Sequence, residues 1–129
     1  MNDESLDVEE KTEEVDILFF EVGAGVFGTD ASQVLRIDRS LPEDITLPEL
    51  GQLHRGNRAL VFDTPEGEGH LKVDTVRGVR PIPVTQLRRM PPTAGAAAYA
   101  VGVCLEEART VLLIDLVETA RTRGTQGRH

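Results

Sequence analysis

Short apolar stretches separated by turn-forming residues set the pattern of this chain. Apolar side chains fill positions 17–20 without interruption, which predicts a strand buried on both faces. Glycines at 23 and 25 then predict a hairpin turn into a second strand. Further hairpins are predicted across the turns at 64–67 and 106–108. Several short strands with few helices predict a mostly β domain of barrel or sandwich type.

Two short helices are predicted from their capping residues. Asp30 with Gln33, and Asp115 with Glu118, have the acid-to-Glu/Gln spacing of a capping box. The second pair predicts a terminal helix that runs through about Arg121.

The strand pattern changes or stops at three places. Apolar side chains stand at the odd-numbered positions 71 and 73, but the next one, Val76, stands at an even-numbered position. A bend or bulge of the strand is therefore predicted near Thr75. Residues 38–57 contain prolines and no convincing strand. Residues 85–89 lie between proline pairs and are interpreted as a connection.

Residues 98–105 alternate between a bulky face and a very small one. The bulky face holds Tyr99, Val101, Val103 and Leu105, and the small face holds Ala98, Ala100, Gly102 and Cys104. A face of such small residues predicts that another element approaches this backbone closely.

The negative charge of the chain is concentrated at its N-terminus. Of the formal net charge of -8, residues 1–16 hold -7, because eight acidic residues there accompany a single lysine. We expect residues 1–16 to form a disordered acidic tail, residues 17–121 a folded domain and residues 122–129 a disordered C-terminal tail. The domain is nearly neutral and offers no basic face, so nucleic acid is not an expected partner.

The location of the chain is predicted from what its sequence contains. Its longest apolar runs are far shorter than the roughly 20 residues of a membrane span. The acidic N-terminal sequence differs from a secretory signal, which begins with positive charge and an apolar stretch. The single cysteine, Cys104, cannot form an internal disulfide. Together these features predict a cytoplasmic protein without membrane insertion.

One motif could bind a ligand. Gly23-Ala-Gly25-Val-Phe-Gly28 has the G-x-G-x-x-G spacing of a dinucleotide fingerprint and follows a predicted strand. A helix must follow the glycines in that fold, whereas the pattern here continues as a strand. A glycine-bearing hairpin is the preferred interpretation. A small β-barrel that binds a ligand or nucleotide through Gly23–Gly28 stays as the alternative function.

No catalytic, cofactor or metal site is predicted, and the chain is not expected to be an enzyme. Cys104 is expected in the core, where burial raises the pKa of a thiol. The three histidines show no ligand spacing. Asp74 and Asp115 follow apolar runs, and turn or capping roles explain both more simply than acid–base chemistry.

The order of these elements resembles the CheW-like family, the coupling proteins of bacterial chemosensory arrays. The similar blocks are ILFFEVGAGVFGTDASQVLRI at 17–37, RALVFDTPEGEGHLKVDTVRGVRPIP at 58–83 and YAVGVCLEEARTVLLIDLVETA at 99–120. The Val-Asp-x-Val core at 73–76 is characteristic of the family. The resemblance implies two small SH3-like β-barrels around an apolar seam, short helices including a C-terminal one, and no cofactor. It also implies a non-catalytic scaffold that links a CheA-type histidine kinase to chemoreceptors.

The chain departs from the family in its middle. Members usually have a Gly-rich hairpin with an Asn-Leu-Arg-Gly-like signature after the third strand, and the closest trace here is Arg55-Gly56. Only about 21 residues separate Ile37 from Ala59, so the hairpin is missing. Two alternatives stay open for the second barrel, a closed one and an incomplete one. The chain is therefore expected to bind one of the usual partners, with the kinase regulatory domain favoured over the receptor. An apolar patch left open there would be a self-association surface.

By matching positions, the resemblance places partner contacts at Val34, Arg36 and Ile37. The family often has an acidic residue where Arg36 stands, which implies a different charge preference in the partner. Two interpretations of Val34 and Ile37 stay open, an interface and an ordinary core position. An Ile37→Asp variant separates them, because it abolishes binding without unfolding only at an interface.

Overall fold

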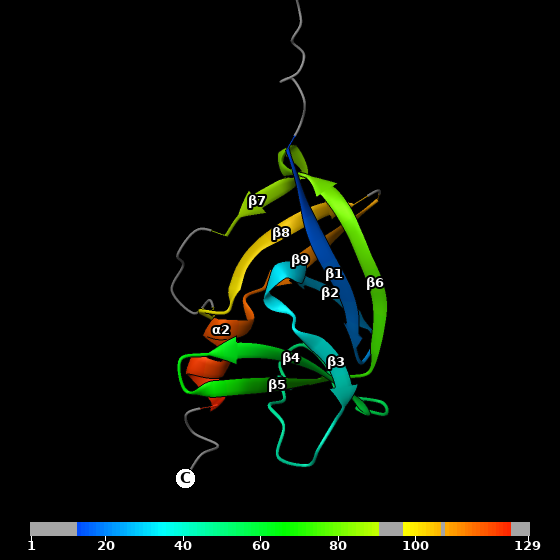
Figure 1. Ribbon diagram of the computed structural model, residues 1–129. Coiled ribbons are helices and arrows are strands. Elements are labelled where there is room, and N and C mark those ends of the chain that lie inside the picture. Colours follow the sequence, from blue (N-terminus) through cyan, green and yellow to red (C-terminus); the bar gives the residue numbers. More distant parts are fainter. Residues whose placement is uncertain (1–12, 91–96, 107, 125–129) are drawn as a thin grey trace, which may run out of the picture.

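The computed structural model describes residues 13–90, 97–106 and 108–124, which form nine strands in two sheets (Figure 1). The prediction of a mostly β domain is confirmed. None of the helices in the described ranges is long and apolar enough to cross a membrane.

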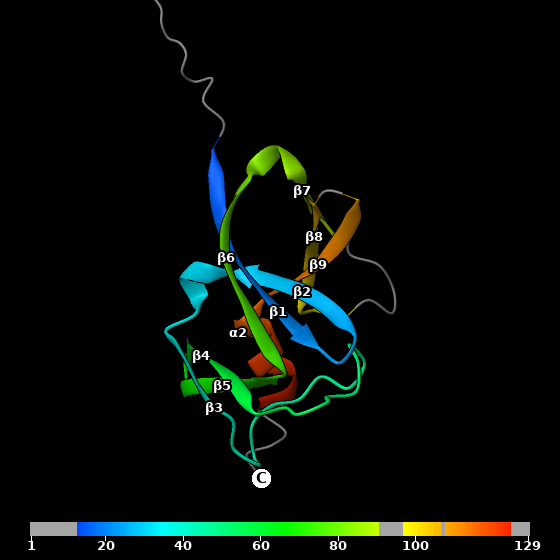
Figure 2. The ribbon, with the colours of Figure 1, turned by 90° about the vertical axis from the view of Figure 1, so that its right-hand side faces the viewer.

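The larger sheet has six strands in the order β6-β1-β2-β9-β8-β7. Their bounds are β1 Glu14–Val22, β2 Gly25–Asp30, β6 Thr75–Pro83, β7 Leu87–Arg89, β8 Ala100–Glu106 and β9 Arg109–Ile114. Neighbouring strands are antiparallel except β2 and β9, which are parallel. The sheet is strongly curved, and β6 bends over its top into β7 (Figure 2).

The smaller sheet has three antiparallel strands, β3 (Arg36–Arg39), β4 (Arg58–Thr64) and β5 (Gly67–Val73). Strand β4 is the central one, and β3 and β5 form the edges. The helical segments are the 3-10 turns η1 (Ala31–Gln33) and η2 (Val84–Gln86), the α-helix α2 (Leu116–Thr119) and the π-turn η3 (Ala120–Gly124).

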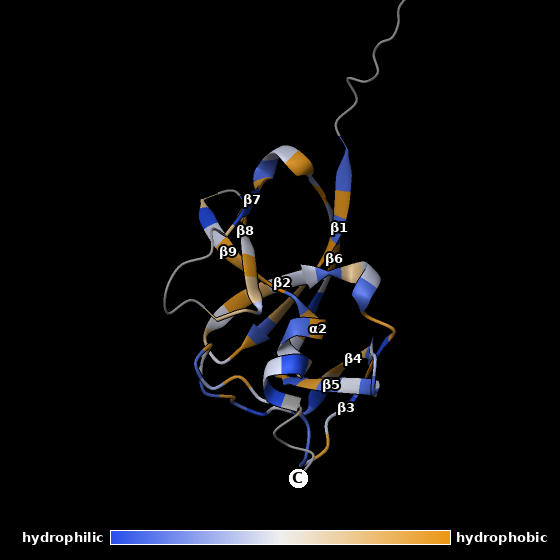
Figure 3. Cartoon of the chain, turned by 90° about the vertical axis from the view of Figure 1, so that its left-hand side faces the viewer, coloured by the Kyte–Doolittle hydropathy of each residue, from blue (hydrophilic) through white to orange (hydrophobic). Residues whose placement is uncertain are grey.

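Alternate residues of β1 supply two separate cores. Leu18 and Phe20 belong to the main core, where β1, the small sheet and α2 meet. Ile17 and Phe19 belong to a second core inside the curve of the large sheet. Both faces of β1 are therefore buried, as the continuous apolar run predicts. Figure 3 shows the apolar positions spread over the strands of both sheets.

The apolar seam implied by the family resemblance is the main core. It contains Leu18, Phe20, Val22, Leu47, Leu60, Phe62, Leu71, Val73, Tyr99, Ile114 and Leu116. Burial of each large apolar side chain contributes about 2 kcal/mol to the free energy of unfolding, so this seam is the main link between the sheets. Two sheets stand where the resemblance implies two barrels, and no pairing between edge strands closes either sheet within the described ranges.

Several predicted turns are confirmed. Val22 pairs with Gly25 across the first hairpin, Thr64 pairs with Gly67 across the second, and Glu106 pairs with Arg109 across the third. The strand break predicted near Thr75 lies at Asp74, between β5 and β6. The close approach predicted beside β8 is also present, because a Cβ added at Gly102 would lie 2.5 Å from the backbone oxygen of Arg88.

Two predictions about connections and caps need correction. Residues 85–89, interpreted as a connection, include the end of η2 and all of β7, which pairs with β8. Gln33 does not complete a capping box, because its side chain accepts a hydrogen bond from the backbone N–H of Leu116 at 3.0 Å instead. Asp30 does accept from the N–H of Ser32, so its capping role holds.

The described strands and turns extend beyond the domain limits expected from the sequence. Strand β1 begins at Glu14, so positions 14–16 of the predicted acidic tail lie in a strand paired with β6. At the other end, η3 extends to Gly124, inside the predicted C-terminal tail. Residues 1–12 and 125–129 lie outside the described ranges.

Candidate docking surface on the small sheet

Strand β3 is an exposed edge strand that follows directly from η1. All four of its residues are exposed to solvent. Ile37 has 43% of its surface exposed, and Leu35, just before the strand, has 49%. Leu41, shortly after the strand, is 45% exposed. Three large exposed apolar side chains therefore lie on one short segment of the chain that includes the edge strand.

Ile37 stands on the face of the small sheet that points toward the main core. It pairs with Leu60, which in turn pairs with Leu71, so the three side chains form one row across the sheet. Leu60 and Leu71 are fully buried, whereas Ile37 lies at the end of the row and is largely exposed. Of the two interpretations, the core position does not fit Ile37.

Val34 occupies a different environment. It is the C-cap residue of η1, its backbone N–H donates to the carbonyl of Ala31 at 3.1 Å, and its side chain packs against the main core. It is partly buried. The structure thus brings Arg36 and Ile37 onto the open strand, on opposite faces, and places Val34 at the junction with the core.

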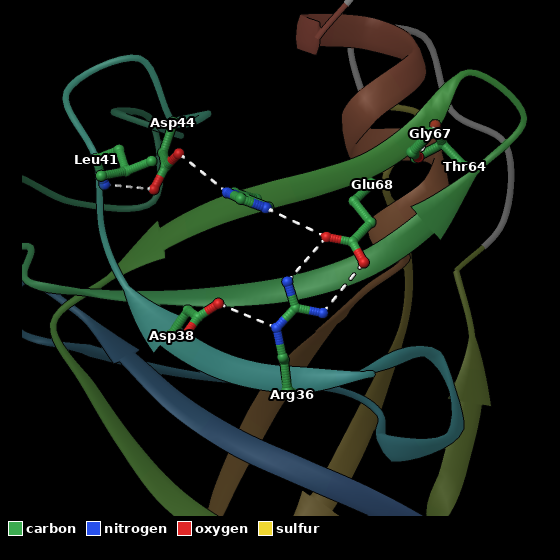
Figure 4. A network of polar contacts seen from close by, with 8 residues as sticks. Arg36, Asp38, Leu41, Asp44, Thr64, Gly67 and Glu68 are labelled. Atoms are coloured by element: carbon green, nitrogen blue, oxygen red, sulfur yellow. Dashed lines mark hydrogen bonds and ion pairs between the residues drawn. The ribbon is translucent and has the colours of Figure 1, made fainter.

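Arg36 is held on the outer face of the sheet by two carboxylates (Figure 4). Its Nη1 and Nη2 donate to the two carboxylate oxygens of Glu68 at 3.1 and 2.9 Å, and its Nε donates to Asp38 at 3.0 Å. The hydrogen bonds to Glu68, and then to Asp38, raise the pKa of Arg36. Arg36 also stands opposite Val61 of β4, which is fully buried.

The charged network continues beyond Arg36. His70 Nδ1 lies 3.4 Å from Asp44, and its Nε2 lies 3.8 Å from Glu68 (Figure 4). These polar contacts therefore connect Arg36 and Asp38 on β3 with Glu68 and His70 on β5, across the outer face of the small sheet. The pairing of Arg36 with Glu68 had no signal in the sequence, because the two residues are 32 positions apart.

A hollow lies beside β3, where the small sheet faces the start of β6. Its lining comes from Glu21, Ile37, His54, Arg55, Asn57, Arg58, Asp74, Thr75 and Val76. Ile37 and Val76 give it an apolar side, and basic and acidic residues surround them. The exposed β3 segment and this hollow together form what we term the β3 surface.

Asp74 fixes the loop that lines this hollow. Its carboxylate accepts hydrogen bonds from the backbone N–H groups of Gly23, His54, Arg55 and Gly56 at 2.7 to 3.0 Å. Burial alone would raise the pKa of Asp74, but the four backbone donors outweigh burial and lower it to about 2. The prediction of a turn role at this strand end is confirmed.

Residues 40–57 replace the missing hairpin without forming a strand of their own. Ile45 makes an isolated parallel bridge to Leu71 on the outer edge of β5. Glu49 accepts hydrogen bonds from the hydroxyl of Tyr99 and from Arg123, which ties the segment to the C-terminal turn. These contacts hold residues 40–57 in place. The segment covers the outer edge of β5 but does not pair with the outer edge of β3.

The glycine motif forms a turn and supports no nucleotide site. Gly23 has φ +60 in the turn between β1 and β2, and strand β2 follows where a phosphate-binding helix would have to begin. A Cβ at Gly28 would lie 2.9 Å from Ile17 and 3.0 Å from Leu113, so this glycine serves packing inside the large sheet. The alternative function through Gly23–Gly28 is not favoured.

The remaining candidate groups also have structural roles. Cys104 is fully buried, and burial raises the pKa of its thiol. Asp115 caps α2 by accepting from the N–H of Glu118 at 3.0 Å. Across the described ranges, no group of three or more His, Cys, Asp or Glu side chains could hold a metal ion.

Comparison with known proteins identifies the family. The chain is 81% identical over 115 residues to the frizzy aggregation protein FrzB of Myxococcus xanthus, a match that covers 89% of this chain and all of FrzB. Its fold is similar to that of the scaffolding protein TtCheW from Thermoanaerobacter tengcongensis, with a TM-score of 0.65 and 19% sequence identity over 78% of this chain and 88% of that one. No family model matches the chain.

The middle segment then has a simple interpretation. Residues 40–57, which lack a strand, occupy the place where the family usually has a Gly-rich hairpin. The chain belongs to the CheW-like family of non-catalytic scaffold proteins in bacterial chemosensory signalling, and it is a shortened member of that family.

Proposed function

We propose that this chain works as a chemosensory adaptor that binds its protein partner through the β3 surface, with Arg36 and Ile37 in direct contact. The observation that supports this most strongly is the exposure of Ile37, at 43%, on a strand whose outer edge is open. Interface cores are depleted in most charged residues but enriched in arginine, so an exposed isoleucine on the same strand as Arg36 suits such a core.

The proposed partner is the regulatory domain of a CheA-type histidine kinase or the cytoplasmic part of a chemoreceptor, and we expect only one of the two to bind. The support is the loss of the hairpin, because a full-length family member offers that additional surface. Of the two, the kinase domain is our first choice. A chain that binds one partner would compete with a full-length coupling protein for it.

The charge of the β3 surface bears on partner choice. Arg36 stands where the family often has an acidic residue, but its charge is partly offset by Glu68 and Asp38. We therefore expect the partner surface to accommodate the positive charge of Arg36 and the neighbouring negative charges together. Such complementarity contributes more to specificity than to affinity.

This role would place the chain in the cytoplasm, where kinases and receptor signalling tips meet adaptors. The buried thiol of Cys104 is in keeping with a reducing compartment.

Titration calorimetry of the full chain against each purified partner tests the proposal. We expect binding to one partner, and we expect Ile37→Asp to weaken that binding at least about tenfold, which corresponds to 1.4 kcal/mol. The matched control is Val79→Asp, because Val79 is also an exposed apolar strand residue, at 51%, but lies on β6 of the large sheet. No binding to either partner, or equal loss with both variants, would contradict the proposal.

A further inference from the structure

The two edge strands of the small sheet differ in their backbone hydrogen bonds. On the β5 edge, Ile45 donates its N–H to the carbonyl of His70 at 2.9 Å and accepts from the N–H of Lys72 at 2.8 Å. On the β3 edge, no strand within the described ranges pairs with the outer side. An open edge of this kind exposes unpaired backbone donors and acceptors.

The backbone groups that point out of the sheet can be identified. The N–H of Ser40 donates to the carbonyl of Asn57 at 3.2 Å, in continuation of the pairing of Arg39 with Arg58. Because backbone groups alternate in direction along an antiparallel strand, the N–H and C=O groups of Ile37 and Arg39 point away from β4. These two residues can pair with another strand without losing a bond to β4.

We propose that this other strand is β3 of a second copy of the chain, paired antiparallel and centred on Ile37. In this register Ile37 lies opposite Ile37 of the second copy. Arg36 lies opposite Asp38 of the second copy, and Asp38 lies opposite its Arg36. The sequence Arg-Ile-Asp at 36–38 is thus complementary in charge to itself when it is reversed.

The charges also exclude the neighbouring registers. Only every second residue of β3 has backbone groups that point outward. A change of register must therefore still place outward-pointing residues of the two copies opposite one another. One shift would place Arg36 opposite Arg36, and the opposite shift would place Asp38 opposite Asp38. Like charges directly opposite one another destabilise a strand pair, so the register centred on Ile37 is favoured over both.

The apolar side chains favour the same register. Ile37 and its counterpart become direct neighbours across the two strands. The Ile37 side chain is 43% exposed in the single chain, so pairing removes apolar surface from water. Short length and charged residues usually protect an edge strand from pairing, but here the charges favour one symmetric arrangement.

Sedimentation of the full chain over a broad concentration range tests this arrangement. We expect a concentration-dependent species of twice the 14.1 kDa mass of the chain. Ile37→Pro should remain a monomer, because proline removes the outward N–H of Ile37 and leaves the bonds to β4 in place. The control Val79→Asp should dimerise like the unaltered chain.

A charge exchange gives a second test that does not require proline in a strand. Arg36→Asp places two acidic residues opposite two acidic residues, and Asp38→Arg places two basic residues opposite two basic residues. Each variant alone should be monomeric, whereas an equimolar mixture should form a heterodimer because opposite charges then face each other. A monomeric unaltered chain, an unchanged dimer in Ile37→Pro, or a mixture that stays monomeric would each overturn the proposal.

The dimer would have one consequence that rests on the proposed function. It covers Arg36 and Ile37, so self-association and partner binding would exclude each other. The two proposals fail independently, since dimerisation is measured on the chain alone and adaptor function is measured with the kinase or receptor present.

Discussion

At the scale of single residues, Asp74 is the side chain on which the geometry of the β3 surface depends most. It is 9% exposed and links three backbone N–H groups of the loop at 54–56 to the turn at Gly23. The sequence indicates a turn role for Asp74 because it follows an apolar strand. It does not indicate which groups Asp74 binds, because the loop precedes it by 18 to 20 positions.

Replacing Asp74 should make the free energy of unfolding less sensitive to acid. The pKa of Asp74 is lowered to about 2, so its contribution is fully present above the unfolded pKa near 4 and is lost as the pH falls toward 2. We expect Asp74→Asn to reduce the free energy of unfolding at neutral pH by about 2 kcal/mol and to make the loss of stability between pH 4 and pH 2 smaller.

Urea unfolding at several pH values measures this effect. The matched control is Asp63→Asn, which makes the same chemical change at an exposed position of β4. Equal acid sensitivity in Asp74→Asn and in the unaltered chain would show that other carboxylates govern acid unfolding.

At the scale of elements, local pattern predicts the strands that are long enough to alternate. The first hairpin follows from its apolar run and its glycines, and the helix α2 follows from Asp115. Strand β7 is missed because its three residues, Leu-Arg-Arg, are too few to show a period. The small residues on one face of β8 do indicate a neighbour there. Gly102 has no side chain, so the backbone of β7 can approach it closely.

Gly102→Ala tests this close approach. The added Cβ would lie 2.5 Å from the backbone oxygen of Arg88, and a backbone atom cannot move aside as a flexible side chain can. We expect the substitution to lower the free energy of unfolding by about 1 to 3 kcal/mol.

Hydrogen exchange shows which strands the Gly102→Ala substitution destabilises. The N–H of Met90, which donates to the carbonyl of Val101 at 2.9 Å beside β7, should lose protection before the amides of β1. Unchanged stability together with unchanged exchange at Met90 would contradict the packing described for β7 and β8.

At the scale of the whole molecule, the three similar blocks predict the family, the mostly β fold and the apolar seam between two β units. The same comparison predicts a missing hairpin but not its structural result. Residues 40–57 cover the β5 edge through Ile45 and leave the β3 edge open, and this asymmetry depends on contacts between distant residues. Arg36 and Ile37 were assigned by matching positions, and only their exposure favours an interface over a core.

The most direct test of the adaptor proposal is hydrogen exchange of the chain with and without its bound partner, at a concentration where the chain is monomeric. We predict that binding protects the backbone amides of Ile37 and Arg39, together with those of the neighbouring residues 35–41. The amides near Val79 on β6 should exchange at the same rate in both states. Protection confined to the large sheet, with β3 unchanged in the complex, would contradict the proposal that β3 is the docking strand.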